Sequence, residues 1–540
     1  MKKKFNSTLL FVTAVLATTV AGCNSKSEEG PKIIQIGVAC KGYRSDFATD
    51  LVEAFNNKHD GVKAKIVYTG PDANYQDNRL QLKNNQVDLI FTLRNTVFAT
   101  QINKTLRHWA DLSDIYDSPL EGYAEADGTK KIKDYMDTSF LNSFTFTDGK
   151  QYAIPFTSGV VGLLYNKTRW DLTNEALKAA GKDELVLPKT TNEMFDLFDR
   201  IKTNDVKKAS GGAYAFSYSG INSYMHFMFN SLWPQYLGSS TAENFFKGQD
   251  ENGVYTADIY KTDARLYSYE VVRKMILASN GYVASEDIGI TYDLEQLSFL
   301  RGKSLFSCNG DWMEAEASKQ FNPGEADVVL LRTPVLSEIV KNPLIADDFN
   351  GSASTKDKKL ANIISLIDEK YIEQDNKPNE ADATTLSVSL NTLNFIYEAR
   401  LVRHTLPDFT AVIPEYSAEL NEAKDFLRFM LSKEGQEIVM NATYGCGSPL
   451  TIDYSQMEYY KIGTSFTKSR LKIIQKSMPY GNANNYPMEF LAGCKPCDDL
   501  RIANGFGVST PITANEFMMN EYNTYATTWS SKMDLAGVSN

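Results

Sequence analysis

One stretch, DGKQYAIPFTSGVVGLLYNKTRWD from Asp148 to Asp171, limits the possible folds of this chain more than any other. It opens on Asp148-Gly149, a dipeptide favoured in tight hairpin turns. Tyr152–Pro155 is predicted to be a short strand that ends at proline, because proline cannot donate to a sheet ladder. Val160–Tyr165 is an apolar run typical of a strand buried on both faces. The segment therefore leaves one sheet and enters another, which predicts two lobes with a cleft between them.

Between these two predicted strands lies a small polar patch, Thr157-Ser158-Gly159. Its hydroxyls and backbone groups have no obvious partner in a sheet, so they are available to a bound solute. We expect Thr157 and Ser158 to lie on the floor of the cleft.

The N-terminal third alternates predicted strands and helices. Ile33–Ala39, Lys63–Tyr68 and Val87–Phe91 are strand-like, and apolar residues from Phe47 to Phe55 have helical spacing. This alternation predicts an α/β fold with a parallel sheet, in which ligands bind beyond the carboxyl ends of the strands.

Two loops follow strands of this sheet and are candidates for ligand contact. The first contributes Lys41 and Tyr43, and the second contributes Arg94 and Asn95. The alternative for each of these residues is an ordinary solvated loop position.

A second distinctive stretch, FLRGKSLFSCNGDWMEAE, runs from Phe299 to Glu316. We expect a strand over Ser304–Cys308, followed by a helix that opens at Asn309-Gly310-Asp311-Trp312. A tryptophan at this point presents a flat apolar face to the C–H groups of a sugar ring, and Asn309 and Asp311 can bond hydroxyls. The alternative for Trp312 is a half-buried structural tryptophan.

A further aromatic candidate, Tyr224, stands where a loop meets a strongly apolar helix. We predict that it contacts ligand, with core packing as the alternative. Phe227, Phe229, Leu232 and Trp233 have helical spacing and are predicted to be core.

The N-terminus has the pattern of a secretory signal: Lys2 to Lys4, an apolar run over Leu9–Ala21, then Cys23. The run is shorter than the roughly 20 residues of a membrane-spanning helix, although a short anchor is the alternative. Val20 to Cys23 resembles a bacterial lipobox. We therefore expect cleavage before Cys23, a diacylglycerol and palmitate on Cys23, and a polar tether up to residue 30.

Composition argues against several classes of partner and chemistry. The net charge of −11 without a block of basic residues argues against nucleic acid. Cys494 and Cys497 form one C-x-x-C in a loop-rich tail, for which a local disulfide or two thiols is favoured over a redox pair. The four histidines are scattered, and no metal-ligand pattern or catalytic motif is present. We expect no cofactor, no metal and no enzymatic activity.

The hairpin turn, YxIP, small polar patch and strand ending in YNK resemble the crossover of family 1 extracellular solute-binding proteins of ABC sugar importers, the maltodextrin-binding type. The stretch around Trp312 is similar to that family's F-x-x-G-x-x-A-M-x-x-x-G-x-W, and Ala423 to Gln436 is similar to its A-x-x-F-L-x-x-x-L-S-x-E-x-Q. The chain departs from the family at Thr92, Arg94 and Asn95, where the family carries a tryptophan and an acid–arginine pair.

The resemblance implies a two-lobed α/β fold of the type II periplasmic-binding-protein kind, with discontinuous lobes joined by hinge strands. The expected layout is a signal peptide over 1–22, a lipidated tether over 23–30, lobe 1 over 31–155 plus 409–460, lobe 2 over 156–337 plus 461–540, and a helical insertion over 338–408.

The resemblance also implies a function. We expect a monomeric, lipid-anchored receptor on the extracytoplasmic face of the cell membrane that binds a carbohydrate and delivers it to an ABC permease. The alternatives are a surface carbohydrate-active enzyme, an adhesin, or a binding protein for peptide or another polar solute.

Overall fold

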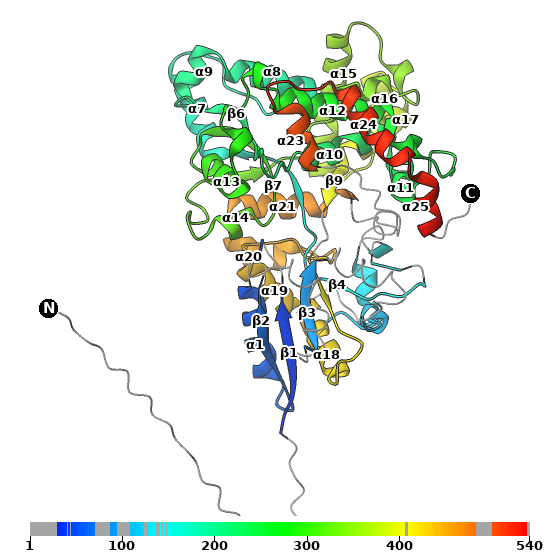
Figure 1. Cartoon of the computed structure of the whole chain (residues 1–540). Helices are drawn as coiled ribbons and strands as arrows, with labels where there is room; N and C mark the ends of the chain where they lie inside the picture. Colours follow the sequence, from blue (N-terminus) through cyan, green and yellow to red (C-terminus); the bar gives the residue numbers. More distant parts are fainter. Residues whose placement is uncertain are drawn as a thin grey trace, which may run out of the picture.

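The computed structural model describes residues 30–39, 42–43, 45–70, 87–93, 109–123, 128–136, 141–142, 144–146, 148–405, 409–481 and 499–536. The fold is α/β with two separate main sheets, one near each end of the molecule (Figure 1). In these ranges, each helix is too short or too polar to cross a lipid bilayer.

The first lobe is built around a five-stranded sheet with the order β2-β1-β3-β10-β4. Its strands are β1 (Lys32–Val38), β2 (Val62–Thr69), β3 (Leu89–Leu93), β4 (Ile154–Pro155) and β10 (Phe409–Val412). β1 is parallel to β2 and β3, as the alternation of strands and helices predicts, whereas β10 is antiparallel to both of its neighbours. A strand from late in the chain thus separates β3 from β4.

Helices with one apolar face cover this sheet. α1 (Asp46–Lys58) buries Phe47, Leu51 and Phe55, and it packs against α18 (Leu420–Leu431) and α19 (Lys433–Ala442). The first lobe therefore combines segments from both ends of the chain.

The second lobe contains a four-stranded sheet with the order β6-β7-β5-β8. Its strands are β5 (Val161–Asn166), β6 (Tyr214–Ser217), β7 (Ser304–Gly310) and β8 (Val328–Leu330). Every residue of β5 and β7 is buried, which in β5 matches the apolar run seen in the sequence.

Helices surround this second sheet and complete the lobe (Figure 1). The core helices are α8 (Thr191–Ile201), α10 (His226–Leu237), α12 (Asp263–Ile276) and α13 (Tyr292–Leu300). Further helices of the second lobe are α7 (Lys167–Ala179), α9 (Asn204–Ala209), α11 (Ser239–Lys247), α14 (Met313–Ala317), α21 (Ser465–Gln475), α23 (Asp499–Phe506), α24 (Ala514–Ala526) and α25 (Trp529–Ala536). Two short helices, α5 (Ser113–Tyr116) and α20 (Glu458–Ile462), belong to the first lobe, where they pack against α18 and α19, respectively.

Two chain segments that connect the lobes run side by side. In the first lobe, Ile154 pairs with Ala411 and Pro155 with Thr410. Beside the second lobe, Val160 forms an antiparallel bridge with Thr405. The passages from β4 to β5 and from β9 (Val402–Thr405) to β10 are therefore joined at both of their ends.

A helical subdomain precedes the second passage. It contains α15 (Ala353–Leu366), a π-helical turn (Ile367–Glu373), α16 (Glu380–Leu386) and α17 (Leu390–Leu401). Its buried residues form a hydrophobic cluster of their own, separate from the cores of the two sheets.

Two local expectations were wrong. The insertion over 338–408 was expected to be helical, but α17 ends at Leu401 and β9 (Val402–Thr405) pairs in parallel with β11 (Met478–Gly481). The β-branched residues at both ends of β9 suit a strand, and a partner far away in sequence decides the outcome. Asn309 and Gly310 were expected to open a helix, but they continue β7, and the next helix begins at Met313.

A buried carboxyl, Glu295 of α13, holds the second sheet to this helix. It accepts hydrogen bonds from Ser217 of β6 at 2.6 Å and from Ser307 of β7 at 2.7 Å. Burial raises the pKa of Glu295 to about 7. Between about pH 4.5 and 7, Glu295 therefore stays protonated in the folded protein, whereas the same carboxyl group is ionised in the unfolded chain.

We predict that Glu295 makes the protein less stable as pH rises from 5 to 7, because folding then requires proton uptake. The Glu295→Gln variant keeps hydrogen-bonding atoms but cannot ionise. From pH 5 to 7, the free energy of unfolding should fall more slowly for this variant than for wild type. The two slopes should differ by up to about 1.4 kcal/mol per pH unit. Urea unfolding at several pH values measures this, with Glu369→Gln on an exposed helix face as control. Parallel curves for wild type and Glu295→Gln would contradict the assignment.

Candidate functional site

Four aromatic side chains from both lobes meet beside the paired connecting segments. We call Tyr43, Phe227, Trp312 and Phe409 the interlobe aromatic cluster. The ring centroids lie 4.6 Å apart for Tyr43 and Phe409, 6.3 Å for Trp312 and Phe409, and 5.9 Å for Trp312 and Phe227. Tyr43 and Phe409 follow or belong to strands of the first sheet, and Trp312 and Phe227 belong to the second lobe.

Trp312 is 7% exposed, because the aromatic residues of the first lobe lie against it. Its ring also covers Gly310: a Cβ atom added there would lie 2.4 Å from the indole ring. A glycine two residues before the tryptophan therefore allows the ring to fold back over the end of β7.

Asp311 connects the two lobes through polar contacts. The Tyr43 hydroxyl donates a hydrogen bond to its carboxylate, and the backbone N–H of Gly447 donates to the other carboxylate oxygen at 3.4 Å. The Arg470 guanidinium donates to its backbone carbonyl. Burial, opposed by the charge of Arg470, raises the pKa of Asp311, and burial with the nearby Asp311 charge raises the pKa of Tyr43 well above its usual value.

The small polar patch of the first connecting segment is fully packed between other segments. Thr157 and Ser158 are both buried. The Ser158 N–H donates to the Gly447 carbonyl at 2.8 Å, and the Thr405 hydroxyl donates to the Ser158 carbonyl. Three separate parts of the chain thus meet at Ser158.

Several buried polar atoms around this point have no hydrogen-bond partner among the described residues. They are the Ser158 hydroxyl, the Asn309 side-chain N–H₂ group and both ring nitrogens of His404. Burial, with smaller contributions from His226 and Arg403, holds the pKa of His404 well below its usual value, so the ring is neutral. Each unsatisfied buried group costs about 1–3 kcal/mol. A ligand rich in hydroxyl groups could satisfy donors and acceptors alike.

The structure brings most of the predicted site residues together. Tyr43, Asp311 and Trp312 are in direct contact, and Tyr224 packs on Phe227 of the cluster with centroids 5.0 Å apart. Asn309 lies next to them on β7, and Thr157 and Ser158 lie on the adjoining segment. Lys41, Arg94, Asn95 and the lipidation candidate Cys23 lie outside the described residues.

The sequence prediction missed three residues at this place. Phe227 was predicted to be core, and it is buried, but it packs against Trp312 rather than only within its own lobe. Phe409 was recognised only as the first residue of the second segment of lobe 1, and His404 only as one of the scattered histidines. An aromatic residue at each lobe crossing is the signal that could have identified Phe409.

Buried thiols at this place have the properties of packing residues. Cys308 lies inside β7, and Cys446 is a fully buried thiol. Burial and the nearby Asp311 charge raise the pKa of Cys446 to about 12. Since the thiolate is the reactive form of cysteine, Cys446 is poorly suited to nucleophilic chemistry at neutral pH. Cys40, Cys494 and Cys497 lie outside the described residues.

We predict that Gly310→Ala displaces the Trp312 ring and destabilises the fold by roughly 1–3 kcal/mol, because the new methyl group overlaps the indole. Urea unfolding and near-ultraviolet circular dichroism measure the two effects. Gly289→Ala is the matched control, because a Cβ atom there meets no atom within 4 Å. If both variants behave like wild type, Trp312 does not fold back over β7.

Comparison with known proteins gives a family and a set of relatives. Residues 41–361 match the sequence model of a family described as bacterial extracellular solute-binding protein. The multiple sugar-binding protein of Streptococcus mutans is 23% identical over 320 residues, which are 58% of this chain. The match spans 66% of that relative's length, just under two thirds.

Solved structures share the fold. The cyclic alpha-maltosyl-1,6-maltose binding protein from Arthrobacter globiformis superposes with a TM-score of 0.55 at 14% identity, covering 93% of this chain and 100% of that one. An ABC substrate-binding protein from Listeria monocytogenes in complex with cycloalternan also gives 0.55, at 12% identity, with coverages of 93% and 99%. The structure therefore has the two-lobed type II periplasmic-binding-protein fold that the sequence predicted.

Proposed function

The chain belongs to the bacterial extracellular solute-binding proteins, and we propose that it captures an oligosaccharide between its lobes and delivers it to the permease of an ABC importer. The observation that carries this proposal is the convergence of Trp312, Tyr43 and Asp311 beside the lobe connections. The names of its relatives, which bind several sugars, support the ligand class.

Each side chain has a role in this proposal. The Trp312 ring packs on the apolar face of a sugar ring, with Tyr43 and Tyr224 as further aromatic surfaces. Asn309, Asp311, Thr157 and Ser158 bond hydroxyl groups. Because the Ser158 and Asn309 side chains are buried without partners, these bonds would remove an existing penalty.

Binding is coupled to lobe movement in this proposal. We propose lobe 1 over 31–155 plus 409–460, lobe 2 over 156–337 plus 461–540, and the insertion over 338–408. Trp312 is covered by first-lobe residues, so sugar enters only when the lobes separate about the paired connecting segments. Ligand then favours the closed state, because only that state offers contacts from both lobes.

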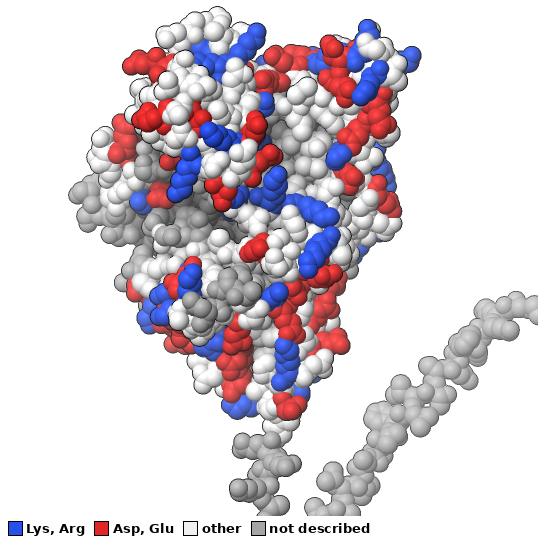
Figure 2. Space-filling model, turned by 180° about the vertical axis from the view of Figure 1, so that it is seen from behind, with Lys and Arg blue, Asp and Glu red and all other residues white. Residues whose placement is uncertain are grey.

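The proposal extends to location and chemistry. Lipid on Cys23, followed by a tether over residues 23–30, holds a monomer at the outer face of the cell membrane. Lys41, Arg94 and Asn95 contribute to the cleft from the loops after the first-lobe strands. The protein acts by binding and release, without catalysis, cofactor or nucleic acid. Figure 2 shows acidic and basic side chains interspersed on the face it presents, over both lobes.

We predict that the protein binds at least one oligosaccharide of a panel of linear and cyclic gluco-, galacto- and xylo-oligosaccharides, as measured by isothermal titration calorimetry. Trp312→Ala should weaken that binding at least tenfold, because it removes the aromatic surface for the sugar ring. Trp312→Phe should retain part of the affinity, since it keeps an aromatic face.

Trp170→Phe is the matched control, because that tryptophan is 7% exposed, like Trp312, but packs on Tyr165 and Phe306 inside the second lobe. Its sugar affinity should equal that of wild type. Hydrolysis of any panel member, or no binding to all of them while a peptide library binds, would refute the proposed function. Unchanged affinity in Trp312→Ala would refute the stacking role.

A further inference from the structure

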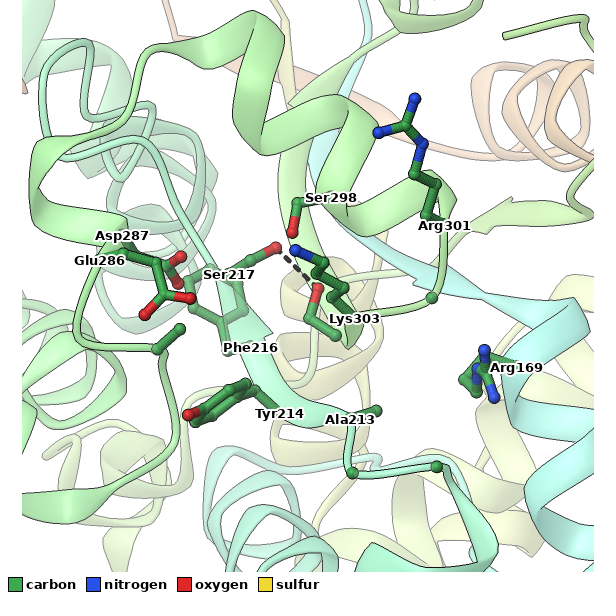
Figure 3. Close-up of a pocket in the computed structure, with 15 residues that line it drawn as sticks. Arg169, Ala213, Tyr214, Phe216, Ser217, Glu286, Asp287, Ser298, Arg301 and Lys303 are labelled. Atoms are coloured by element: carbon green, nitrogen blue, oxygen red, sulfur yellow. Dashed lines mark hydrogen bonds between the residues drawn. The ribbon is translucent and has the colours of Figure 1, made fainter.

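A cavity lies in the second lobe, away from the interlobe aromatic cluster. Its volume is about 240 Å³ (Figure 3). Residues at the start of β6 and β7 line it, including Tyr214 and Ser304. β7 runs from Ser304 at this cavity to Gly310 beside Trp312, so about 20 Å separates the two places at ~3.3 Å per residue. The cavity is therefore distinct from the proposed sugar site.

Charges of opposite sign stand on different sides of the cavity. Glu286 and Asp287 lie on one side, and Lys303 extends toward the middle of the cavity from the other (Figure 3). Arg169 stands on the same basic side, whereas the guanidinium of Arg301, at the rim, points away from the cavity (Figure 3). Among the described residues, these five side chains form no ion pair with one another. The cavity thus keeps acidic and basic groups apart.

Asp287 provides an unsatisfied acceptor. Its side chain is 4% exposed, and its Oδ2 atom is buried without a hydrogen-bond partner among the described residues. A buried carboxyl oxygen without a partner is rare in folded proteins, so this atom has room for a hydrogen bond from a ligand.

Hydroxyl groups form the floor of the cavity and add further acceptors. Ser304 donates to Ser217 at 2.7 Å, and Ser217 donates to the buried Glu295 at 2.6 Å. Both hydroxyl protons are therefore in use, and a lone pair of Ser304 remains for a donor from a ligand. The acidic side and the floor together present acceptors.

The basic side presents donors held in place by packing. The Arg169 guanidinium donates to the Ser210 carbonyl at 3.4 Å and lies against Gly302. A Cβ atom at Gly302 would come within 2.6 Å of the Arg169 Nε atom, and Gly302 has a φ of +75°, which side chains rarely adopt. This glycine leaves the room that the guanidinium occupies.

We propose that this cavity is a second binding site, for a small zwitterion of the α-amino-acid class. Its ammonium group is received by Asp287, Glu286 and Ser304, and its carboxylate faces Lys303, with Arg169 on the same side. A cavity of about 240 Å³ has room for a molecule of this size. A simple anion would face two carboxyl groups, and a simple cation would face two basic groups.

Isothermal titration calorimetry at pH 7.5 tests this with glycine, L-alanine, L-serine, L-glutamate and L-lysine as probes. Acetate and methylammonium serve as single-charge probes. At least one amino acid should bind saturably, with at least tenfold higher affinity than either single-charge probe. Lys303→Gln should weaken that binding at least tenfold, because the carboxylate loses its central partner.

Lys358→Gln, an exposed lysine of α15, is the matched control and should bind the amino acid like wild type. Lys303 is itself exposed, so its replacement leaves the fold intact, and oligosaccharide binding by Lys303→Gln should be unchanged. Asp287→Asn should also weaken amino-acid binding. The proposal is overturned if no amino acid binds, if acetate binds as tightly, or if Lys303→Gln binds like wild type, which would place the amino acid elsewhere.

Discussion

The pairing of β10 between β3 and β4 is the constraint on which the two-lobed arrangement depends. This strand returns from the second lobe and closes the first sheet, with antiparallel pairing on both sides. Because the Val160–Thr405 bridge joins the same two segments beside the second lobe, the described ends of the two connections are paired. Bending at these paired connections is the hinge motion that the proposed capture of a solute between two lobes requires.

The position of Trp312 follows from these paired connections. Asp311 donates its backbone N–H to the Val160 carbonyl at 2.9 Å, so the end of β7 is fixed directly to the first connection. Gly310 then lets the indole turn back toward Phe409, which begins the returning strand. Sheet pairing thus places an aromatic ring of one lobe against an aromatic ring of the other, and opening of the lobes would expose both.

Much of this could be predicted from the sequence, because the decisive signals are local. Pro155 and the apolar run after Val160 marked the first connection, and both strands are present. β9 was missed because its partner β11 lies more than 70 residues further along the chain. The contact of Phe227 with Trp312 was missed for a related reason: a buried aromatic looks the same in sequence whether its neighbours belong to one lobe or two. Lys41, Arg94 and Asn95 stay predictions.

The buried polar atoms oppose the contact between the lobes that the aromatic rings favour. Each aromatic pair among Trp312, Tyr43 and Phe409 contributes about 0.5–1.5 kcal/mol beyond its buried area. The unsatisfied groups of Ser158, Asn309 and His404 act in the opposite direction, at about 1–3 kcal/mol each. In the proposed function, a ligand that satisfies these groups removes that cost, and binding thereby favours the arrangement in which both lobes contact the ligand.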